Sequence, residues 1–278
     1  MPNFNKTSKV AAAAVAAFFL CYCGKDAAVT DVTVTEIPED TPLRLPTRVT
    51  LTEGCLSADI FIYCNDGALG RLEDHFHLDS VPGTVTLDLL EGEKTVMCVS
   101  DIHGTFHPEA LASVEALETL RFRKCDDGGS IPVRSGSAIC KAGGECTLRM
   151  DPLRSTVVLH SVANNLGGYT LLEDPEAFLT NSNSAAELFR AAGFFPNETL
   201  DTTSRASLPC DVGYFTQFPD LELLCYPDES ASTRLVFACR IEGEPCQWTV
   251  PLPAIRRNTR LTVELEINGP HSLSSHIY

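Results

Sequence analysis

The sequence has few basic residues and no long hydrophobic run. Its 278 residues carry 21 Lys and Arg against 37 Asp and Glu, for a formal net charge of −16. Such an acidic chain repels phosphate backbones and anionic lipid heads, which argues against nucleic-acid binding and electrostatic docking to membranes. The apolar stretch Val10–Leu20 rises about 1.5 Å per residue, so it is too short to cross a hydrocarbon core of roughly 30 Å.

The sequence also lacks the motifs of common enzyme and metal sites. It has no Gly-x-Ser-x-Gly elbow, P-loop, Rossmann glycine pattern or Cys-x-x-Cys pair. Asp101 and His103 resemble the first metal motif of metallophosphoesterases, but the later ligands for a second metal do not follow. We therefore predict no enzyme activity, catalytic residue, metal site or cofactor. A phosphoesterase acting through Asp101 and His103 is the third-ranked alternative.

The N-terminus has the three-part build of an export signal. Lys6 and Lys9 precede the apolar run, and Cys21-Tyr22-Cys23 follows it. This junction resembles a bacterial lipobox, and Cys23 fits the lipidated position better than Cys21 because Leu20 stands three residues before it. We predict a signal peptide over 1–22 and a lipid on Cys23 that holds the protein on a membrane. Acylation of Cys21 and an ordinary secretory signal remain alternatives.

The mature chain is long enough for two domains of ordinary size. Residues 23–42 are acidic and predict a tether. Period-two alternation, clearest from Leu261 to Ile267, indicates short strands separated by turn residues. This pattern predicts an all-β protein with two tandem antiparallel β-sandwiches, over 43–162 and 163–278, with short helices in loops.

Three segments are predicted to lie outside strands. Pro108–Leu120 repeats apolar residues at three-residue spacing behind a first-turn proline, which predicts a helix. Ser184 and Glu187 form a capping box, so a second short helix is predicted to run from there to Gly193. The Gly- and Ser-rich stretch Asp126–Gly144 is predicted to be a loop.

Twelve cysteines are a high count for this length. Cys140 and Cys146 flank a glycine-containing segment, and Cys239 and Cys246 flank a predicted hairpin turn, so each pair is a candidate disulfide in an exported protein. The alternative is that these cysteines fill buried strand positions as small apolar residues. The sequence leaves both interpretations open.

Several segments together resemble the FimB-like anchor or accessory lipoproteins of type V pili in Bacteroidales. The early strand ends at a turn followed by Gly-x-Leu, a Gly turn precedes an apolar strand, and a Leu-Thr-Asn segment and a final meander follow in the same order. The matching segments are Ile60–Leu69, Leu90–Val96, Ala177–Asn183, Thr233–Phe237, Ile241–Glu244, Trp248–Pro253 and Arg257–Ile267. Glu93 and Lys94 depart from the usual small-aromatic pair of that family, and the cysteine count is unusual.

The resemblance implies transthyretin-like, Greek-key sandwiches and assembly with other fimbrial subunits by donor-strand exchange, in which a strand of one subunit completes a sheet of the next. It also implies surface exposure on the outer membrane, in a fimbrium, and a role in adhesion. Stalk and tip subunits of that family are cut near the first strand by an Arg-specific protease. Arg44 and Arg48 stand where such a cut would fall, although surface arginines of an uncut anchor are the alternative.

A different class of function remains as the second alternative. A stand-alone surface lipoprotein could present loops to a glycan or a host protein, and an aromatic platform on those loops would favour it. Trp248 is the single tryptophan and is predicted to be buried in a strand, which argues mildly against such a platform.

Overall fold

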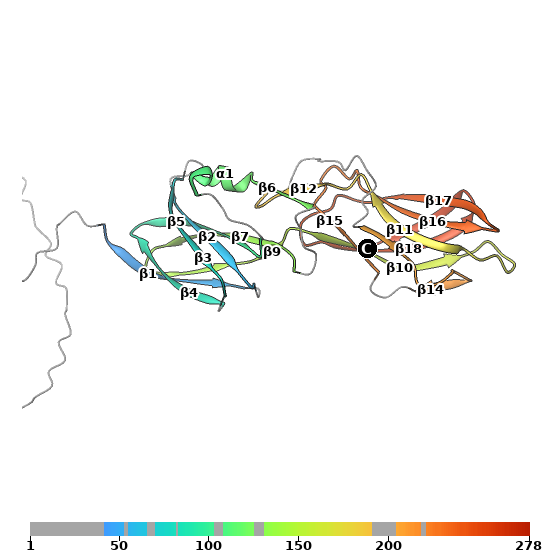
Figure 1. Ribbon diagram of the computed structural model, residues 1–278, viewed down its shortest axis with the longest axis horizontal. Coiled ribbons are helices and arrows are strands. Elements are labelled where there is room, and N and C mark those ends of the chain that lie inside the picture. The colour runs from blue at the N-terminus through green and yellow to red at the C-terminus, as the bar shows by residue number, and fades with distance from the viewer. Residues whose placement is uncertain are drawn as a thin grey trace, which may run out of the picture. The chain divides into compact units, whose positions relative to one another are not determined.

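The computed structural model describes residues 42–52, 55–65, 70–81, 83–102, 108–124, 131–190, 204–217 and 221–278 (Figure 1). Pro42–Tyr278 forms one compact unit, and the segment Met1–Thr41 lies outside the described residues. Strands dominate, so the predicted all-β class is confirmed. Among the described residues, no helix is both long and apolar enough to span a membrane.

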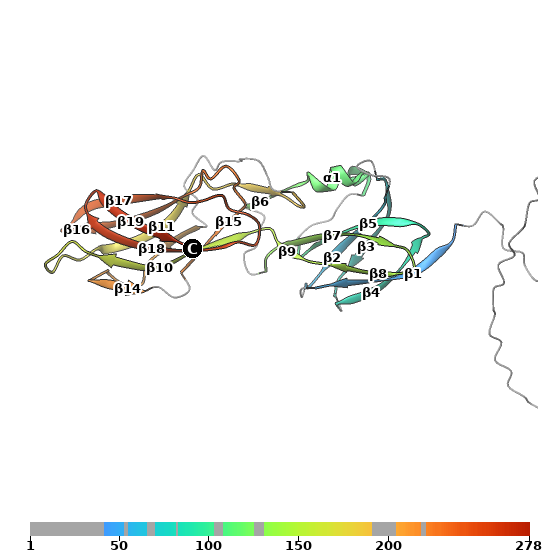
Figure 2. The same cartoon turned by 180° about the vertical axis from the view of Figure 1, so that it is seen from behind.

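The first half of the unit forms two facing sheets, the first sheet pair. One sheet has the order β4-β1-β8 and the other has the order β3-β2-β5-β7-β9 (Figure 2). These strands are β1 (Arg44–Leu51), β2 (Ala58–Cys64), β3 (Leu72–Leu78), β4 (Thr84–Leu90), β5 (Glu93–Ser100), β7 (Arg134–Lys141), β8 (Glu145–Leu148) and β9 (Asp151–Pro152).

The side chains of β2 explain why this strand is apolar along almost its whole length. Ile60 and Ile62 point into the core between the two sheets, whereas Phe61 and Tyr63 point to the opposite face of the same sheet. All four side chains are fully buried. Because successive residues of a strand face opposite sides, the sheet that contains β2 is covered on both faces.

The outer face of that sheet is covered by elements from both halves of the chain. They are η2 (Pro108–Leu111), α1 (Val114–Glu118), β6 (Arg121–Arg123) and β12 (Ala185–Glu187). Leu117 of α1, Phe122 of β6, Ala186 of β12 and the later Tyr226 pack with Phe61 in one group of buried residues, which we call the shared cluster.

The two predicted helices came out differently. Pro108–Leu120 is helical only in part, because it breaks at Ala112 and restarts where the Ser113 hydroxyl caps the N–H of Ala116. The second prediction is wrong. Ala185–Glu187 is a strand that pairs antiparallel with Arg121–Arg123, and the predicted end at Gly193 lies outside the described residues. Burial of Ala186 and Leu188 with period two outweighs the local capping signal.

The predicted loop over Asp126–Gly144 is also partly wrong. Arg134–Lys141 is strand β7 and pairs along its whole length with β5. A Cβ added to Gly136 would lie 2.3 Å from the carbonyl oxygen of Arg149, so glycine is needed there for close passage of the chain. The glycine therefore marks a tightly packed strand.

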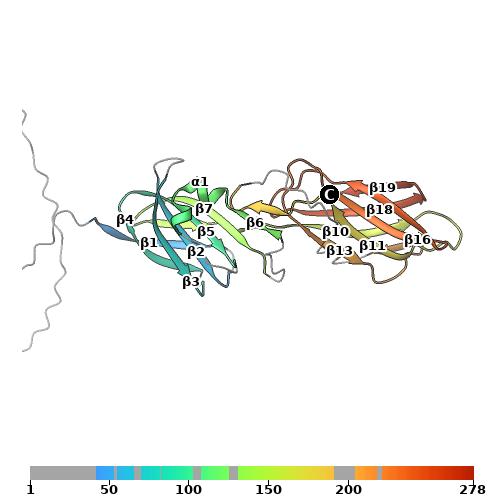
Figure 3. The same ribbon diagram turned by 45° about the horizontal axis from the view of Figure 1, so that its top comes forward.

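The second half forms two more sheets, the second sheet pair (Figure 3). One sheet has the order β14-β10-β18-β19 with β15 also on β10, and the other has the order β13-β11-β16-β17. The strands are β10 (Ser155–Asn164), β11 (Glu173–Thr180), β13 (Arg205–Ser207), β14 (Phe215–Gln217), β15 (Glu222–Cys225), β16 (Arg234–Ile241), β17 (Glu244–Pro251), β18 (Arg260–Gly269) and β19 (Ser272–Ile277).

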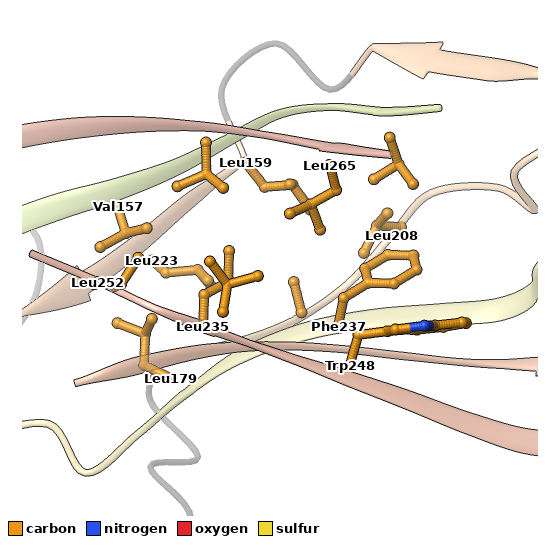
Figure 4. Close-up of a cluster of buried hydrophobic side chains, with 14 of the residues drawn as sticks. Val157, Leu159, Leu179, Leu208, Leu223, Leu235, Phe237, Trp248, Leu252 and Leu265 are labelled. Carbon is orange, nitrogen blue, oxygen red and sulfur yellow. The ribbon is translucent and has the colours of Figure 1, made fainter. Parts of the chain in front are cut away.

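The core of the second sheet pair is built by inward-facing residues of both sheets (Figure 4). Val157 and Leu265 approach it from one sheet, and Leu235 and Phe237 approach it from the other. Trp248 is 5% exposed and donates its indole N–H to the carbonyl of Gly269 at 3.2 Å. The expectation that Trp248 is buried in a strand is therefore met.

One pairing scheme recurs in both halves. The first strand of each half, β1 or β10, has an antiparallel neighbour on one side and a parallel neighbour from late in that half on the other. The division into two domains stays a prediction. Any such boundary falls before Ser155 instead of after Val162, because the whole of β10 is hydrogen-bonded into the second sheet pair.

Candidate functional site

Strand β1 lies in the middle of its sheet. It pairs antiparallel with β4, where Arg44 lies opposite Leu90 and Thr50 lies opposite Thr84. It pairs parallel with β8, where Arg48 lies opposite Glu145 and Leu51 lies opposite Leu148. Both backbone edges of β1 are therefore engaged in the described structure. Removal of this strand would leave a slot between β4 and β8 with unpaired backbone groups on both sides.

The inward side chains of β1 fill the core of the first sheet pair. Thr47 and Val49 are fully buried and Leu51 is 5% exposed. The Thr47 hydroxyl accepts a hydrogen bond from the N–H of Gly143 at 2.9 Å. The slot thus takes alternate side chains of a strand and fixes its register. These are the structural requirements of a groove that accepts a strand.

The predicted processing residues Arg44 and Arg48 lie on the opposite face of β1. Arg44 binds the carboxylate of Asp74 at 3.2 Å and the carbonyl of Asp88 at 2.9 Å, and Arg48 binds Glu145 at 3.1 Å. Their side chains are 48% and 62% exposed. The arginines are reachable, but a protease that binds extended backbone requires β1 to leave the sheet first. Cleavage at either residue stays a prediction.

Strand β19 is a terminal strand with a single partner. It lies at the end of its sheet and pairs only with β18 in the described part of the chain. Leu273 and Ile277 are partly buried against the core. After β19, Tyr278 and Thr262 exchange two backbone hydrogen bonds of 3.0 and 3.2 Å. In the described part of the chain, one backbone edge of β19 therefore has no strand partner.

The structure brings both predicted cysteine pairs together as free thiols. Cys239 and Cys246 stand directly opposite each other across β16 and β17. Cys140 lies in one sheet and Cys146 in the facing one, and their thiols interact. The hydrogen bond from Cys146 lowers the pKa of the Cys140 thiol against the opposing effect of burial, and the nearby Lys94 adds to the lowering. Disulfide formation stays a prediction for both pairs.

The lipidation prediction cannot be placed on the structure. Cys21 and Cys23, the signal peptide over 1–22 and nearly all of the tether over 23–42 lie outside the described residues. His103 does as well.

The carboxylate of Asp101 has a structural role. It accepts hydrogen bonds from the backbone N–H groups of Leu56 and Ser57, at 2.9 and 3.2 Å. Asp59 accepts from His75 and His77 at 2.8 and 3.1 Å. Within the described residues, no group of three or more His, Cys, Asp and Glu is arranged to hold a metal ion.

A cavity of about 480 Å³ lies beside the turn at 164–168 and was not predicted from the sequence. It is lined by Asn164, Asn165, Gly167, Gly168, Tyr169, Thr170, Leu171, Gly213 and Tyr214. Tyr169 and Tyr214 are exposed and Asn164 is buried. Two tyrosines beside glycine-rich turns were the available signal, but their meeting depends on the antiparallel bridge between Leu172 and Val212.

Similar architecture occurs in solved structures of bacterial surface proteins. A candidate cell adhesion protein from Bacteroides eggerthii superposes with a TM-score of 0.61 at 12% identity, over 85% of this chain and 95% of that one. A fimbrial assembly protein from Parabacteroides distasonis superposes with a TM-score of 0.57 at 10% identity, over 84% of this chain and 95% of that one. The chain has the fold of these proteins.

A third structure extends the same likeness. A fimbrilin from Porphyromonas gingivalis superposes with a TM-score of 0.54 at 10% identity, over 82% of this chain and 91% of that one. No protein-family model matches the sequence, and no curated protein sequence matches it. The two sheet pairs therefore follow an architecture found in fimbrial proteins, although little of the sequence is shared.

Proposed function

We propose that this chain is a fimbrial subunit of the FimB-like type, an anchor or accessory component of a type V pilus that supports adhesion. The observation that carries the proposal is the position of β1, whose inward side chains Thr47, Val49 and Leu51 fill a slot bounded by strands on both sides. The shared fold with fimbrial and adhesion proteins supports it. The subunit would assemble with other fimbrial subunits and would not act as an enzyme.

Donor-strand exchange is the assembly mode that this arrangement favours. A strand from a neighbouring subunit could replace β1 and regain both rows of backbone hydrogen bonds and the three buried side-chain positions. Strand β19, with one partner and partly buried Leu273 and Ile277, is the element that could be donated. A lipid on Cys23 would keep an uncut subunit on the outer membrane, exposed at the cell surface.

The mature protein extracted from cells tests the anchor role. The mass of its N-terminal peptide is measured for the unmodified chain and for Cys23→Ala, and sheared pili are probed for the protein in parallel. An acylated Cys23 with an intact chain supports a retained anchor. A chain that starts after Arg44 or Arg48 without lipid indicates a processed stalk or tip subunit instead. Failure of the protein to co-purify with pilus subunits, from sheared pili and from detergent-solubilised membranes alike, contradicts the fimbrial proposal.

Arg-specific processing has a matched control in this chain. Lysine at positions 44 and 48 keeps the positive charges that bind Asp74 and Glu145 but removes the recognition residue of an Arg-specific protease. If the N-terminal residue of the mature protein changes in Arg44→Lys or in Arg48→Lys, the substituted residue is the cleavage site. An unchanged start in the double variant excludes processing at both.

The second candidate function is a stand-alone binding lipoprotein. The cavity rimmed by Tyr169 and Tyr214 favours it, because exposed aromatic residues at a concave site are typical of ligand binding. Recovery of the protein with pilus subunits separates the two functions. A lipoprotein that binds a ligand alone would be solubilised from the membrane without pilus subunits, whereas an anchor would be solubilised with pilus subunits attached.

A further inference from the structure

One buried amide fixes the shape of the cavity beside 164–168. Asn164 is 5% exposed and lies at the end of β10. Its side-chain amide donates to the carbonyls of Thr170 and Val212, at 2.9 and 3.4 Å, and its side-chain oxygen accepts from the N–H of Leu166 at 3.1 Å. Its backbone N–H donates to the carbonyl of Tyr214 at 2.8 Å. These contacts join both walls of the cavity.

The two tyrosines at the rim are fully available to a ligand. Tyr169 is 103% exposed and Tyr214 is 83% exposed, counted over the whole residue. Gly167 and Gly168 both adopt positive φ, at 80° and 65°, and this turn projects Tyr169 from the loop. Two large aromatic rings are exposed to water at one concave site, where they contribute little to packing. Exposed apolar groups gathered in this way are typical of an interaction site.

The lining defines the chemistry of the ligand. None of the lining residues carries a charge, and the polar groups are the amides of Asn164 and Asn165, the Thr170 and tyrosine hydroxyls and backbone groups. Asn165 is exposed and its amide donates to the side-chain oxygen of Asn268 at 2.9 Å. A ligand with hydroxyl groups on its edges and C–H groups on its faces matches amides beside tyrosine rings.

We propose that this cavity binds a neutral saccharide, with Tyr169 and Tyr214 stacking on sugar rings and Asn165 and Thr170 hydrogen-bonding to hydroxyl groups. The volume of about 480 Å³ falls within the roughly 300–1,000 Å³ of small-molecule sites. A stable protein partner would need about 800 Å² of matching surface on this chain, far more than one small concave site provides. The uncharged lining disfavours phosphorylated and other anionic ligands.

The test uses the full-length protein in detergent on a printed array of oligosaccharides. Half of the array carries neutral glycans built from hexoses and N-acetylhexosamines, and half carries sialylated or sulfated glycans. Bound glycans are then titrated in solution against Tyr169→Ala, Tyr214→Ala and the control Tyr278→Ala. Tyr278 is a comparable exposed tyrosine, 70% exposed, but it pairs with Thr262 at the far end of β18 from Asn268.

The expected result is binding to a subset of neutral glycans, with Kd raised about tenfold or more in each rim variant and unchanged in Tyr278→Ala. Three results overturn the proposal: binding to no neutral glycan, equal binding by all variants, or loss of pilus assembly in the rim variants with no glycan bound. The last would make the rim a subunit contact. Saccharide binding is independent of the fimbrial proposal, because it is measured on the isolated chain.

Discussion

At the scale of single residues, Asp228 is a buried charge whose carboxylate is surrounded by hydrogen-bond donors. It is 1% exposed, and its carboxylate accepts hydrogen bonds from the backbone N–H groups of Ser230, Ser232 and Thr233 and from their hydroxyls. Burial alone would raise its pKa, but the hydrogen bonds from Ser230, Thr233 and Ser232 prevail and lower it to about 2. This one side chain organises the loop between β15 and β16.

We expect Asp228→Asn to lower the free energy of unfolding by about 2 kcal/mol at pH 7, because an amide cannot accept all of these hydrogen bonds. The folded-state pKa lies below the ordinary 3.8, so the carboxylate stabilises the fold above about pH 4 and loses this contribution as the pH falls toward 2. Urea unfolding between pH 7 and pH 2.5 measures both effects. The exposed Asp88→Asn is the control. Equal pH dependence in Asp228→Asn and the unmodified chain would contradict the prediction.

The two cysteine pairs make a second prediction at this scale. If exported chains are oxidised, peptide mapping without reductant should recover Cys140 linked to Cys146 and Cys239 linked to Cys246. Each link closes a short loop, so each should add about 2 kcal/mol by restricting the unfolded chain. Thermal unfolding with and without reductant measures the gain. Mapping that finds only free thiols would favour cysteine as a small buried apolar residue.

At the scale of elements, the sequence predicted strands wherever apolar and polar residues alternate over several positions. Strand β18 was recognised from this period, which is clearest from Leu261 to Ile267. The wrong predictions over 126–144 and 184–193 share one cause, which is that contacts distant in sequence outweigh local preference. Gly136 lies where the backbone of Arg149 passes close to β7. Ala186 is in a strand because its segment pairs with the segment that contains Phe122.

A substitution at Gly136 tests this explanation. A Cβ there would lie 2.3 Å from the Arg149 carbonyl oxygen and 3.0 Å from the Met150 sulfur, so Gly136→Ala forces backbone to move. We expect a loss of about 1–3 kcal/mol in stability. Ser137→Ala, at an exposed neighbouring position of β7, should leave stability nearly unchanged. Chemical unfolding of both variants gives the comparison, and similar stabilities would mean that the close passage is not needed.

At the scale of the whole unit, the candidate sites were predicted unevenly. Arg44 and Arg48 were proposed because the resemblance places a cut near the first strand, and the slot around that strand depends on β8, which joins β1 from about a hundred residues later. The cavity beside 164–168 depends on a contact between Leu172 and Val212. The residues that line it form no periodic pattern in the sequence from which the cavity could be predicted. Sites assembled from one strand can be predicted from the sequence, whereas sites assembled by tertiary pairing cannot.

Arg257 joins the two halves of the described unit. Its guanidinium donates to the carbonyl of Leu188 at 3.0 Å, to the hydroxyl of Ser135 at 2.7 Å and to the carbonyl of Asp151 at 2.9 Å. Burial lowers its pKa, although the nearby Asp151 opposes the shift, and an arginine stays charged under these conditions. Three acceptors from separate segments therefore depend on one planar cation that precedes β18.

We expect Arg257→Met to lower stability by about 2–4 kcal/mol, because it removes a charged donor that makes three hydrogen bonds in a partly buried site. Arg257→Lys should recover only part of the loss, since an ammonium cannot reproduce the planar fork. The exposed neighbour Arg256→Met is the matched control. If the two sheet pairs are separable domains held together by this residue and the shared cluster, calorimetry of Arg257→Met should show two transitions where the unmodified chain shows one. A single transition at the temperature of Arg256→Met would mean that Arg257 does not couple the halves.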